Sequence, residues 1–253
     1  MIAPGLFSDK DPSKMNNDSD KRNPPEEHTR IDFFTVMGHD LKSPLNAVES
    51  YLDIMQGKIL GEDIDAYMPI IGNCFARLNQ MRELITDVVD FSRLDSPETP
   101  RSLISVDLSK IAHAVLNSFS AQAQERNISI STEIEDAVII EAEAKEIELI
   151  IRHLAGNAIK YNTEGGSVRV TVRRSGPSIE LIVSDTGIGI SEQDRQRLFQ
   201  AFVRIKNKDT QDIRGTGLGL AIVKRLVDLY KGSISVASKP GIETVFSVVL
   251  PAL

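Results

Sequence analysis

The sequence predicts an α+β protein in which a helical hairpin is followed by a two-layer α/β sandwich. Apolar residues recur at helical spacing over residues 31–95, whereas short β-rich runs alternate with longer helical runs over residues 102–253. The polar residues 1–30 are expected to form a disordered or loosely ordered arm. Residues 96–101, which include the motif SPETP at residues 96–100, are expected to link the two domains.

The two helices of the hairpin each carry a narrow apolar seam. In the second helix the seam residues are spaced alternately by three and four positions: Ile64, Tyr67, Ile71, Cys74, Leu78, Met81, Ile85 and Val88. The first helix has a similar stripe: Phe34, Met37, Leu41, Leu45, Val48, Leu52 and Met55. Such narrow seams bury little surface within one hairpin, so we expect a homodimer in which two hairpins form a four-helix bundle. Cys74 lies in the seam and is expected to be a small core residue.

The composition argues against several classes of protein. A net charge of -7 disfavours nucleic acid or an anionic membrane surface as the main partner. The single cysteine can form neither an internal disulfide nor a cysteine-rich zinc site, so a cytoplasmic location is the default expectation. The sequence has no run of about 18 apolar residues, and we therefore expect no membrane segment in this chain.

The α/β sandwich is predicted because β-rich runs alternate with helical runs along the sequence. The β-rich runs cover residues 103–107, 128–134, 137–140, 167–174, 178–185, 233–238 and 244–251. The helical runs cover residues 108–126, 144–161 and 218–230. We expect the helices to pack on one face of a mixed sheet.

Two segments of the sandwich place polar groups where a ligand can be bound. In HLAGNAIKYN, residues 153–162, Asn157 and Lys160 lie three positions apart and share a helix face. An amide oxygen beside an ammonium group suits a magnesium-phosphate ligand, although a plain polar helix face has the same pattern. In VSDTGIGI, residues 183–190, Asp185 ends an apolar strand and can accept a hydrogen bond from an amine such as that of adenine; an ordinary turn is the alternative.

Two further segments provide cations and glycines. RLFQAFVRIKNKDTQDIR, residues 197–214, is consistent with a mobile lid whose cations bind phosphates, and equally with a solvated loop; its cations include Arg204, Lys206, Lys208 and Arg214. GTGLGLAIVKRL, residues 215–226, places glycines before an apolar helix, whose N-terminal amides suit an anion. It is neither a Walker loop, since the required lysine is missing, nor a dinucleotide fingerprint, since Leu220 replaces the third glycine.

Together the four segments resemble, in order and spacing, the N, G1, F and G2 boxes of the sensor histidine kinases. The ATP-binding fold of that family is shared with gyrase, a heat-shock chaperone and a mismatch-repair ATPase. HDLKSPL, residues 39–45, resembles the phosphoacceptor box of the same family, and DVVDFSRLD, residues 87–95, resembles the end of its second dimerisation helix. The resemblance covers residues 31 to about 250.

The resemblance implies a role for each matching residue. His39 would be the phosphorylated residue, Asp40 the adjacent acid that polarises it, and Ser43 the position linked to dephosphorylation of the partner. Asn157 would be the Mg²⁺ ligand. The other matching positions are Lys160 as a phosphate contact, Tyr161 near the nucleotide, Asp185 as the adenine-binding acid with Gly187 and Gly189 beside it, Arg204 in the lid, and Gly215, Gly217 and Gly219 at the phosphate-side hinge.

Several positions differ from the family pattern. His153 replaces a second asparagine, and Ser43 replaces a threonine or asparagine. Lys231 and Glu243 each replace a glycine. We therefore expect the magnesium shell to be completed differently near His153, and the lid dynamics or the nucleotide affinity to differ.

The resemblance implies an ATP-dependent protein histidine kinase of two-component signal transduction. It would autophosphorylate His39 and pass the phosphoryl group to an aspartate of a separate response-regulator receiver domain. Two alternatives stay open: a catalytically weak ATP-binding dimeric scaffold, and mainly a response-regulator phosphatase that uses Asp40 and Ser43. His39 lies about 200° from the apolar stripe, so its side chain is expected to face solvent. Pro44 removes a helical hydrogen bond to the carbonyl of Asp40 and is expected to loosen or bend the helix there.

Overall fold

A computed structural model of the chain describes residues 24–94, 101–205, 207–208, 210–211, 213 and 215–252, and the side chains of residues 24–36 and 39 are outside that description. Most of the expected arm and nearly all of the expected linker therefore lie outside the described residues. The chain divides into two units after His39. None of the helices in the described part combines the length and the apolar character that crossing a bilayer requires.

Helix α1 (Pro24–Gln56) begins within the stretch expected to be an arm. Proline is tolerated in the first turn of a helix, because the amide that it lacks has no helical partner there. The acidic residues Glu26 and Glu27 follow it, and negative charge is favourable near a helix N-terminus. The helix continues through Pro44, which is buried, so this proline does not end the helix.

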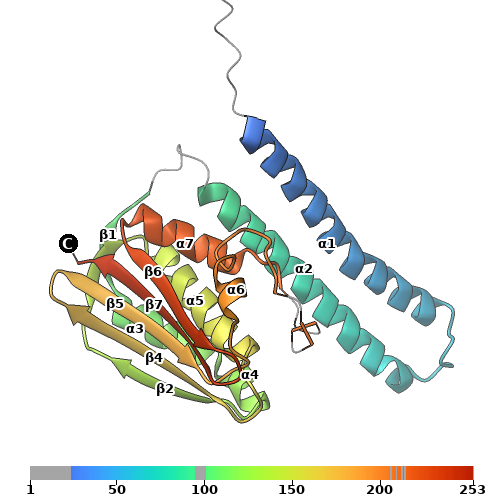
Figure 1. Cartoon of the computed structure of the whole chain (residues 1–253). Helices are drawn as coiled ribbons and strands as arrows, with labels where there is room; N and C mark the ends of the chain where they lie inside the picture. The colour runs from blue at the N-terminus through green and yellow to red at the C-terminus, as the bar shows by residue number, and fades with distance from the viewer. Residues whose placement is uncertain are drawn as a thin grey trace, which may run out of the picture. The chain divides into compact units, whose positions relative to one another are not determined.

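A short 3-10 helix, η1 (Ile64–Tyr67), leads into α2 (Met68–Leu94), and residues 40–56 of α1 form an antiparallel hairpin with α2 (Figure 1). Only part of each seam is buried within one chain: Val48, Tyr67 and Cys74. The burial of Cys74 confirms its expected place in the core. Five further seam positions remain 42–62% exposed, namely Leu45, Leu52, Ile64, Leu78 and Ile85. The hairpin therefore presents an apolar face that the described residues of the chain do not cover.

The sandwich contains one five-stranded mixed sheet (Figure 1). Its strands, in spatial order, are β2 (Ser129–Ile134), β4 (Ser167–Ser175), β5 (Ser178–Asp185), β7 (Glu243–Pro251) and β6 (Ser233–Lys239). β2 pairs with β4 in parallel and the other pairs are antiparallel. A separate antiparallel pair, which the sequence did not predict as separate, joins β1 (Ile104–Asp107) to β3 (Ile139–Ala142).

The helices of the sandwich are α3 (Leu108–Ser118), α4 (Ser120–Glu125), α5 (Ala144–Lys160), α6 (Glu192–Arg195) and α7 (Gly219–Leu229). α5 lies between α3 and α7 and contacts β4 and β5, which gives the expected layer of helices on the sheet. Apolar side chains from both layers are buried between them, including Leu154, Ile159, Val170, Val183 and Leu226.

The single helix expected over residues 108–126 is wrong, because the chain breaks it at Phe119. The amide of Phe119 donates to the carbonyl of Leu116, a tighter connection than an α-helical turn. At the break, the ring of Phe119 packs against α5 where Gly156 has no side chain: a Cβ there would lie 3.4 Å from the ring. Helical periodicity contains no information about such a tertiary contact.

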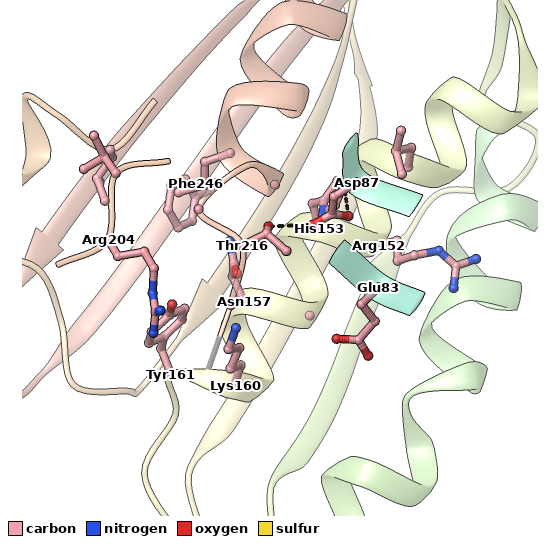
Figure 2. Close-up of a pocket in the computed structure, with 18 of the residues that line it drawn as sticks. Glu83, Asp87, Arg152, His153, Asn157, Lys160, Tyr161, Arg204, Thr216 and Phe246 are labelled. Atoms are coloured by element: carbon pink, nitrogen blue, oxygen red, sulfur yellow. Dashed lines mark hydrogen bonds and ion pairs between the residues drawn. The ribbon is translucent and has the colours of Figure 1, made fainter. Parts of the chain in front are cut away.

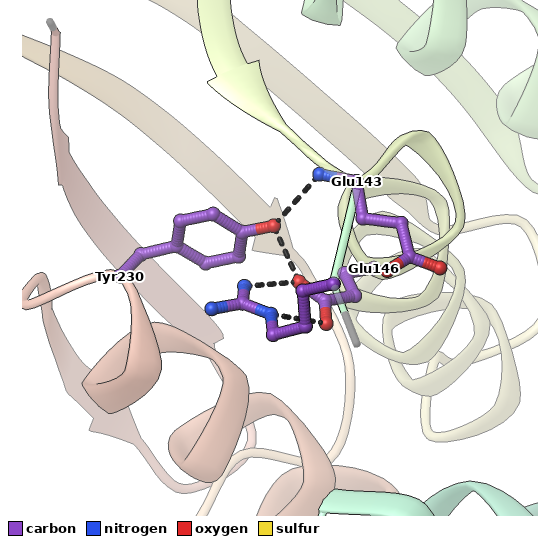
Figure 3. A network of polar contacts seen from close by, with 4 residues as sticks. Glu143, Glu146 and Tyr230 are labelled. Carbon is purple, nitrogen blue, oxygen red and sulfur yellow. Dashed lines mark hydrogen bonds and ion pairs between the residues drawn. The ribbon is translucent and has the colours of Figure 1, made fainter. Parts of the chain in front are cut away.

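Arg101, Glu146 and Tyr230 tie the start of the sandwich to α5 and to the end of α7 (Figure 3). Arg101 Nε donates to Glu146 Oε1 at 2.9 Å, and a second guanidinium nitrogen donates to the other carboxylate oxygen. The guanidinium also lies 4.7 Å from the centre of the Tyr230 ring. The Tyr230 hydroxyl donates to Glu146 and accepts from the amide of Glu143. Bidentate arginine–carboxylate pairs are among the stronger polar contacts, so this cluster fixes three segments together.

Candidate active site

The polar segments of the sandwich meet around one cavity of about 1140 Å³. Its walls come from α5, the end of β5, the segment after β5 and the glycine segment that leads into α7 (Figure 2). The predicted site residues that line it are Asn157, Lys160, Tyr161, Asp185, Gly189, Arg204, Gly215, Gly217 and Gly219. Segments far apart in the sequence thus form a single site.

Helix α5 supplies Asn157 and Lys160 from its last turns. The opposite face of the helix is fully apolar and buried, with Ile151, Leu154 and Ile159, and this burial orients the polar face toward the cavity. Burial lowers the pKa of Lys160, and the Arg204 guanidinium acts in the same direction. Two cations are therefore close together at this wall, an arrangement that suits a polyanionic ligand.

Tyr161 and Arg204 lie beside Lys160 (Figure 2). The ammonium group of Lys160 lies 5.4 Å from the centre of the Tyr161 ring. Burial raises the pKa of Tyr161, so its hydroxyl remains protonated. Arg204 donates to the carbonyl of Ile213 at 2.7 Å, which holds it against the later part of the same loop. Two other expected cations of that loop, residues 206 and 214, lie outside the described residues.

Asp185 is a buried carboxyl group at the end of β5. Burial raises its pKa to about 6, and a hydrogen bond from the Gly187 amide, at 2.9 Å, opposes this shift. On the neighbouring strand, Thr244 lies opposite Asp185 in register, is also buried and lines the same cavity. A carboxylate acceptor next to a hydroxyl can bind the exocyclic amine of a purine.

The glycines of the site allow close packing of the backbone. A Cβ on Gly187 would overlap the carbonyl of Tyr161, so the chain after β5 can lie against the end of α5 only with glycine at this position. Gly217 has φ +72°, a conformation that other residues seldom adopt. Its carbonyl accepts from the amide of Phe202, which joins the glycine segment to the lid segment.

His153 lies one turn before Asn157 on α5 and is directed toward Asp87 of α2 (Figure 2). Its Nε2 is 4.0 Å from Asp87 Oδ1 and, within the described part of the chain, has no hydrogen-bond partner. Burial lowers the pKa of His153 to about 4, so the imidazole is neutral near pH 7.

The described residues contain no group of three or more histidine, cysteine, aspartate or glutamate side chains able to hold a metal ion. Magnesium differs from zinc in this respect, because it keeps several waters and is commonly bound by one or two protein oxygens together with phosphates. Asn157 offers one amide oxygen on the cavity wall, next to the cations that would contact those phosphates. The residues present therefore fit a magnesium ion that enters with its nucleotide.

Two predicted residues of α1, Asp40 and Ser43, belong to the part of the chain that the structure describes in full. Among the described residues that line the cavity, neither Asp40 nor Ser43 occurs. Ser43 is exposed and Asp40 is partly buried on the helix. The expected exposure of the His39 side chain falls outside the described side chains.

The residues of the cavity wall that sequence reasoning missed include Asp87, Thr216 and Thr244. Thr216 stands between two of the predicted glycines, so the motif itself contained the signal. Thr244 can be identified as a site residue only once the strand pairing places it opposite Asp185. Asp87 belongs to the hairpin, and nothing in the local sequence connects it with a site formed by the sandwich.

Two family models match the chain. Residues 29–97 match the His Kinase A (phospho-acceptor) domain, and residues 142–253 match the Histidine kinase-, DNA gyrase B-, and HSP90-like ATPase family. The hairpin and the sandwich are thus a phosphoacceptor domain and an ATPase-type domain, and with both the chain belongs to the sensor histidine kinases.

Individual relatives and solved structures match over most of this chain. The sensor-like histidine kinase SenX3 of Mycolicibacterium smegmatis is 30% identical over 89% of this chain and 58% of its own length. The crystal structure of full-length ShkA in complex with AMPPNP matches with a TM-score of 0.63 and 27% identity, over 90% of this chain and 46% of ShkA. ThkA in complex with the response regulator protein TrrA matches in fold, with a TM-score of 0.70 and 19% identity, over 91% of this chain and 64% of ThkA. The chain spans 23–58% of the length of the curated relatives.

Proposed function

We propose that this chain is the kinase core of a two-component system, which transfers the γ-phosphoryl group of ATP to His39. The observation that supports this most is the convergence of the four polar segments on one cavity. ShkA, a relative with the same fold, is described in complex with an ATP analogue. Because phosphotransfer from ATP requires a compartment that contains ATP, we place this domain pair in the cytoplasm.

The residues of the cavity would bind and orient ATP. Asp185 would accept a hydrogen bond from the adenine amine, with Thr244 beside it. Lys160 and Arg204 would pair with the phosphates, and the backbone of Gly215, Gly217 and Gly219 would lie along them. A bound Mg²⁺, held by Asn157, would offset phosphate charge.

His39 and Asp40 would carry out the transfer. A neutral imidazole is a good nucleophile near pH 7, because its ordinary pKa is about 6.5. As the N–P bond forms, the bond from the γ-phosphorus to the bridging oxygen breaks and ADP leaves with that electron pair. The Asp40 carboxylate would hold the imidazole in the reactive tautomer and stabilise its developing positive charge.

Incubation with γ-labelled ATP tests this proposal. We expect label on the wild-type chain that is stable in base and labile in acid, and no label on His39→Gln. The variant should still bind ATP, because His39 is not needed for the nucleotide site. Label at the wild-type level on the variant would contradict the role of His39, and ATP binding without any label would favour the scaffold alternative.

We also propose a homodimer and a separate response-regulator receiver domain as partners. The uncovered apolar face of the hairpin supports the first. The structure of ThkA with its response regulator, which has the same fold, supports the second. Phosphotransfer from labelled His39 to a panel of receiver domains would identify the partner.

A phosphatase activity toward the same partner is the second candidate. Ser43 lies one turn after His39 on α1 and is exposed, so its hydroxyl is accessible to orient a water molecule. Loss of phosphate from a phosphorylated receiver, reduced in Ser43→Ala, would demonstrate this activity.

A further inference from the structure

An acidic face of α2 lines the same cavity as the candidate phosphate-binding residues. Glu83, Asp87 and Asp90 follow one another at spacings of four and three, so they share one side of the helix. This side of α2 is held near the sandwich by apolar contacts: Val88, Phe91 and Leu94 pack against its core. Carboxylates thus lie where the proposed function requires a triphosphate to bind.

Asp87 makes the most direct contact of the three. Thr216 Oγ1 donates to Asp87 Oδ2 at 2.6 Å, and the same Thr216 oxygen accepts from the amide of Leu218 at 3.1 Å (Figure 2). Asp87 therefore holds the middle of the glycine segment that would lie along the phosphates.

The groups that stabilise the Asp87 carboxylate are the same groups that a bound phosphate would contact. Burial raises the pKa of Asp87, whereas the Thr216 hydrogen bond and the charge of Lys160 lower it. Conversely, Glu83 and Asp87 raise the pKa of Lys160 against the effect of its burial. His153 does not neutralise Asp87, because its buried imidazole is uncharged near pH 7 and lies 4.0 Å away. Thr216 and Lys160 are thus engaged by an anion that the protein itself supplies.

We infer that Asp87 is an internal competitor for the phosphate subsite and makes nucleotide affinity depend on phosphate charge. The inference rests on the proposed function of the cavity. A phosphate group must displace the carboxylate from Thr216 and share Lys160 with it, and like charges in a partly buried site repel strongly. This repulsion is absent for adenosine, which has no phosphate, and it is greater for ATP than for ADP. Binding of ATP would therefore also weaken the hold of α2 on the glycine segment.

Calorimetric titration of the full chain with adenosine, ADP and ATP, at one fixed magnesium concentration, tests this inference. Asp87→Asn removes the charge but keeps an oxygen that can accept from Thr216, so the fold should be preserved. We expect the affinity of this variant for ATP to rise about tenfold, the effect typical of one hydrogen bond to a charged group. The affinity for ADP should rise less, and that for adenosine should not change.

Glu62→Gln provides the matched control. It removes the same charge from the turn that precedes α2, where Glu62 is exposed and pairs with Lys58 outside the cavity. An equal gain in ATP affinity for this control would overturn the inference, because net charge alone would then explain the effect. Weaker ATP binding by Asp87→Asn would also overturn it and would make Asp87 part of the nucleotide-holding set.

The failure of the inference can be distinguished from the failure of the proposed function. An equal change for adenosine, ADP and ATP in Asp87→Asn would reject charge competition while nucleotide binding remained intact. Absence of binding of all three ligands to the wild-type chain would instead reject the nucleotide site itself, and the inference with it.

Discussion

At the scale of single residues, the fold changes the acidity of the Asp185 carboxyl group. It lies at the end of an apolar strand and is only 6% exposed. Burial raises its pKa to about 6 from an ordinary value of 3.8, although the Gly187 amide partly compensates. Because the carboxylate form accepts a hydrogen bond from an amine, ligand binding and the titration of Asp185 should be linked.

We predict that adenosine binds more weakly as the pH falls below about 6, by about tenfold for each pH unit. Adenosine is the suitable probe because it has no phosphate that titrates in this range. NMR titrations between pH 5 and pH 8 would measure the affinity, with Asp185→Asn as the control. This variant should bind weakly at every pH; a wild-type affinity that does not change with pH would contradict the prediction.

The titration of Asp185 also affects the stability of the free protein, and here a lower pH is favourable, whereas for adenosine binding it is unfavourable. The raised pKa means that the protonated carboxyl is favoured in the folded state. Protonation of Asp185 therefore adds to the free energy of unfolding fully below about pH 4, and this contribution is lost as the pH rises through about 6. A buried acid at a ligand site thus makes the free protein less stable at neutral pH than an amide at the same position would.

Residues with a local signal were predictable from the sequence, whereas residues defined by distant partners were not. Asp185 and the glycines near it stand in one short motif, and in the structure Asp185 and Gly189 line the same cavity as the end of α5. The hydrogen bond between Thr216 and Asp87 joins residues 129 positions apart, in two domains that were predicted separately from their own local patterns. Such a contact follows from tertiary packing alone.

At the scale of elements, the C-terminal end of α5 depends on an arginine from outside the helix. Arg126 follows α4, and its guanidinium donates to the carbonyls of Ile159, Lys160 and Asn162. The last carbonyls of a helix have no helical partner, and a cation there also interacts favourably with the helix dipole. Arg126 thereby fixes the turn that carries Lys160 and Tyr161.

We predict that Arg126→Met lowers the free energy of unfolding by about 1–3 kcal/mol, because it leaves partly buried carbonyls without donors. Urea unfolding would measure the change. Arg169→Met is the matched control: Arg169 is exposed and pairs with the exposed Glu133 at the surface, so its loss should cost about 0.5 kcal/mol or less. Equal effects of the two substitutions would argue against the capping role.

The elements themselves were mostly predictable, because strands and long helices follow from local periodicity. The expected strands and the helices around residues 144–160 and 219–229 are present. The exceptions have tertiary causes. Phe119 breaks a helix where its ring packs on α5, and β1 and β3 pair apart from the main sheet. Helix α6 is one turn long, too short for periodicity to indicate it.

At the scale of the whole molecule, the hairpin leaves apolar side chains uncovered along both helices. Phe75, Leu78 and Ile85 are each about half exposed or more on α2, as is Leu52 on α1. Several large apolar side chains exposed on one pair of helices favour an interface with a partner. The sequence predicted the seam, but burial within one chain shows how much of it remains for a partner.

We predict that the double substitution Leu78→Glu and Ile85→Glu converts a dimer into a monomer of 27.9 kDa. An apolar interface would remove two new carboxylates from water without giving them a partner, and this desolvation is strongly unfavourable. Analytical ultracentrifugation would measure the mass. Ile242→Glu is the control, because Ile242 is 59% exposed at the turn between β6 and β7 of the sandwich. A dimeric double variant would contradict this interface.

The cluster of Arg101, Glu146 and Tyr230 has a consequence for where the ATPase-type domain begins as a folding unit. The family match starts at residue 142, after β1, α3, α4, β2 and most of β3. A shortened chain that began there would keep the predicted site residues of the sandwich that line the cavity, Asn157 to Gly219. It would nevertheless lose the partner strand of β3 and leave the carboxylate of Glu146, whose side chain is 12% exposed, without its cation. A stable folding unit should therefore begin at or before Arg101, about forty residues earlier than the start of the family match.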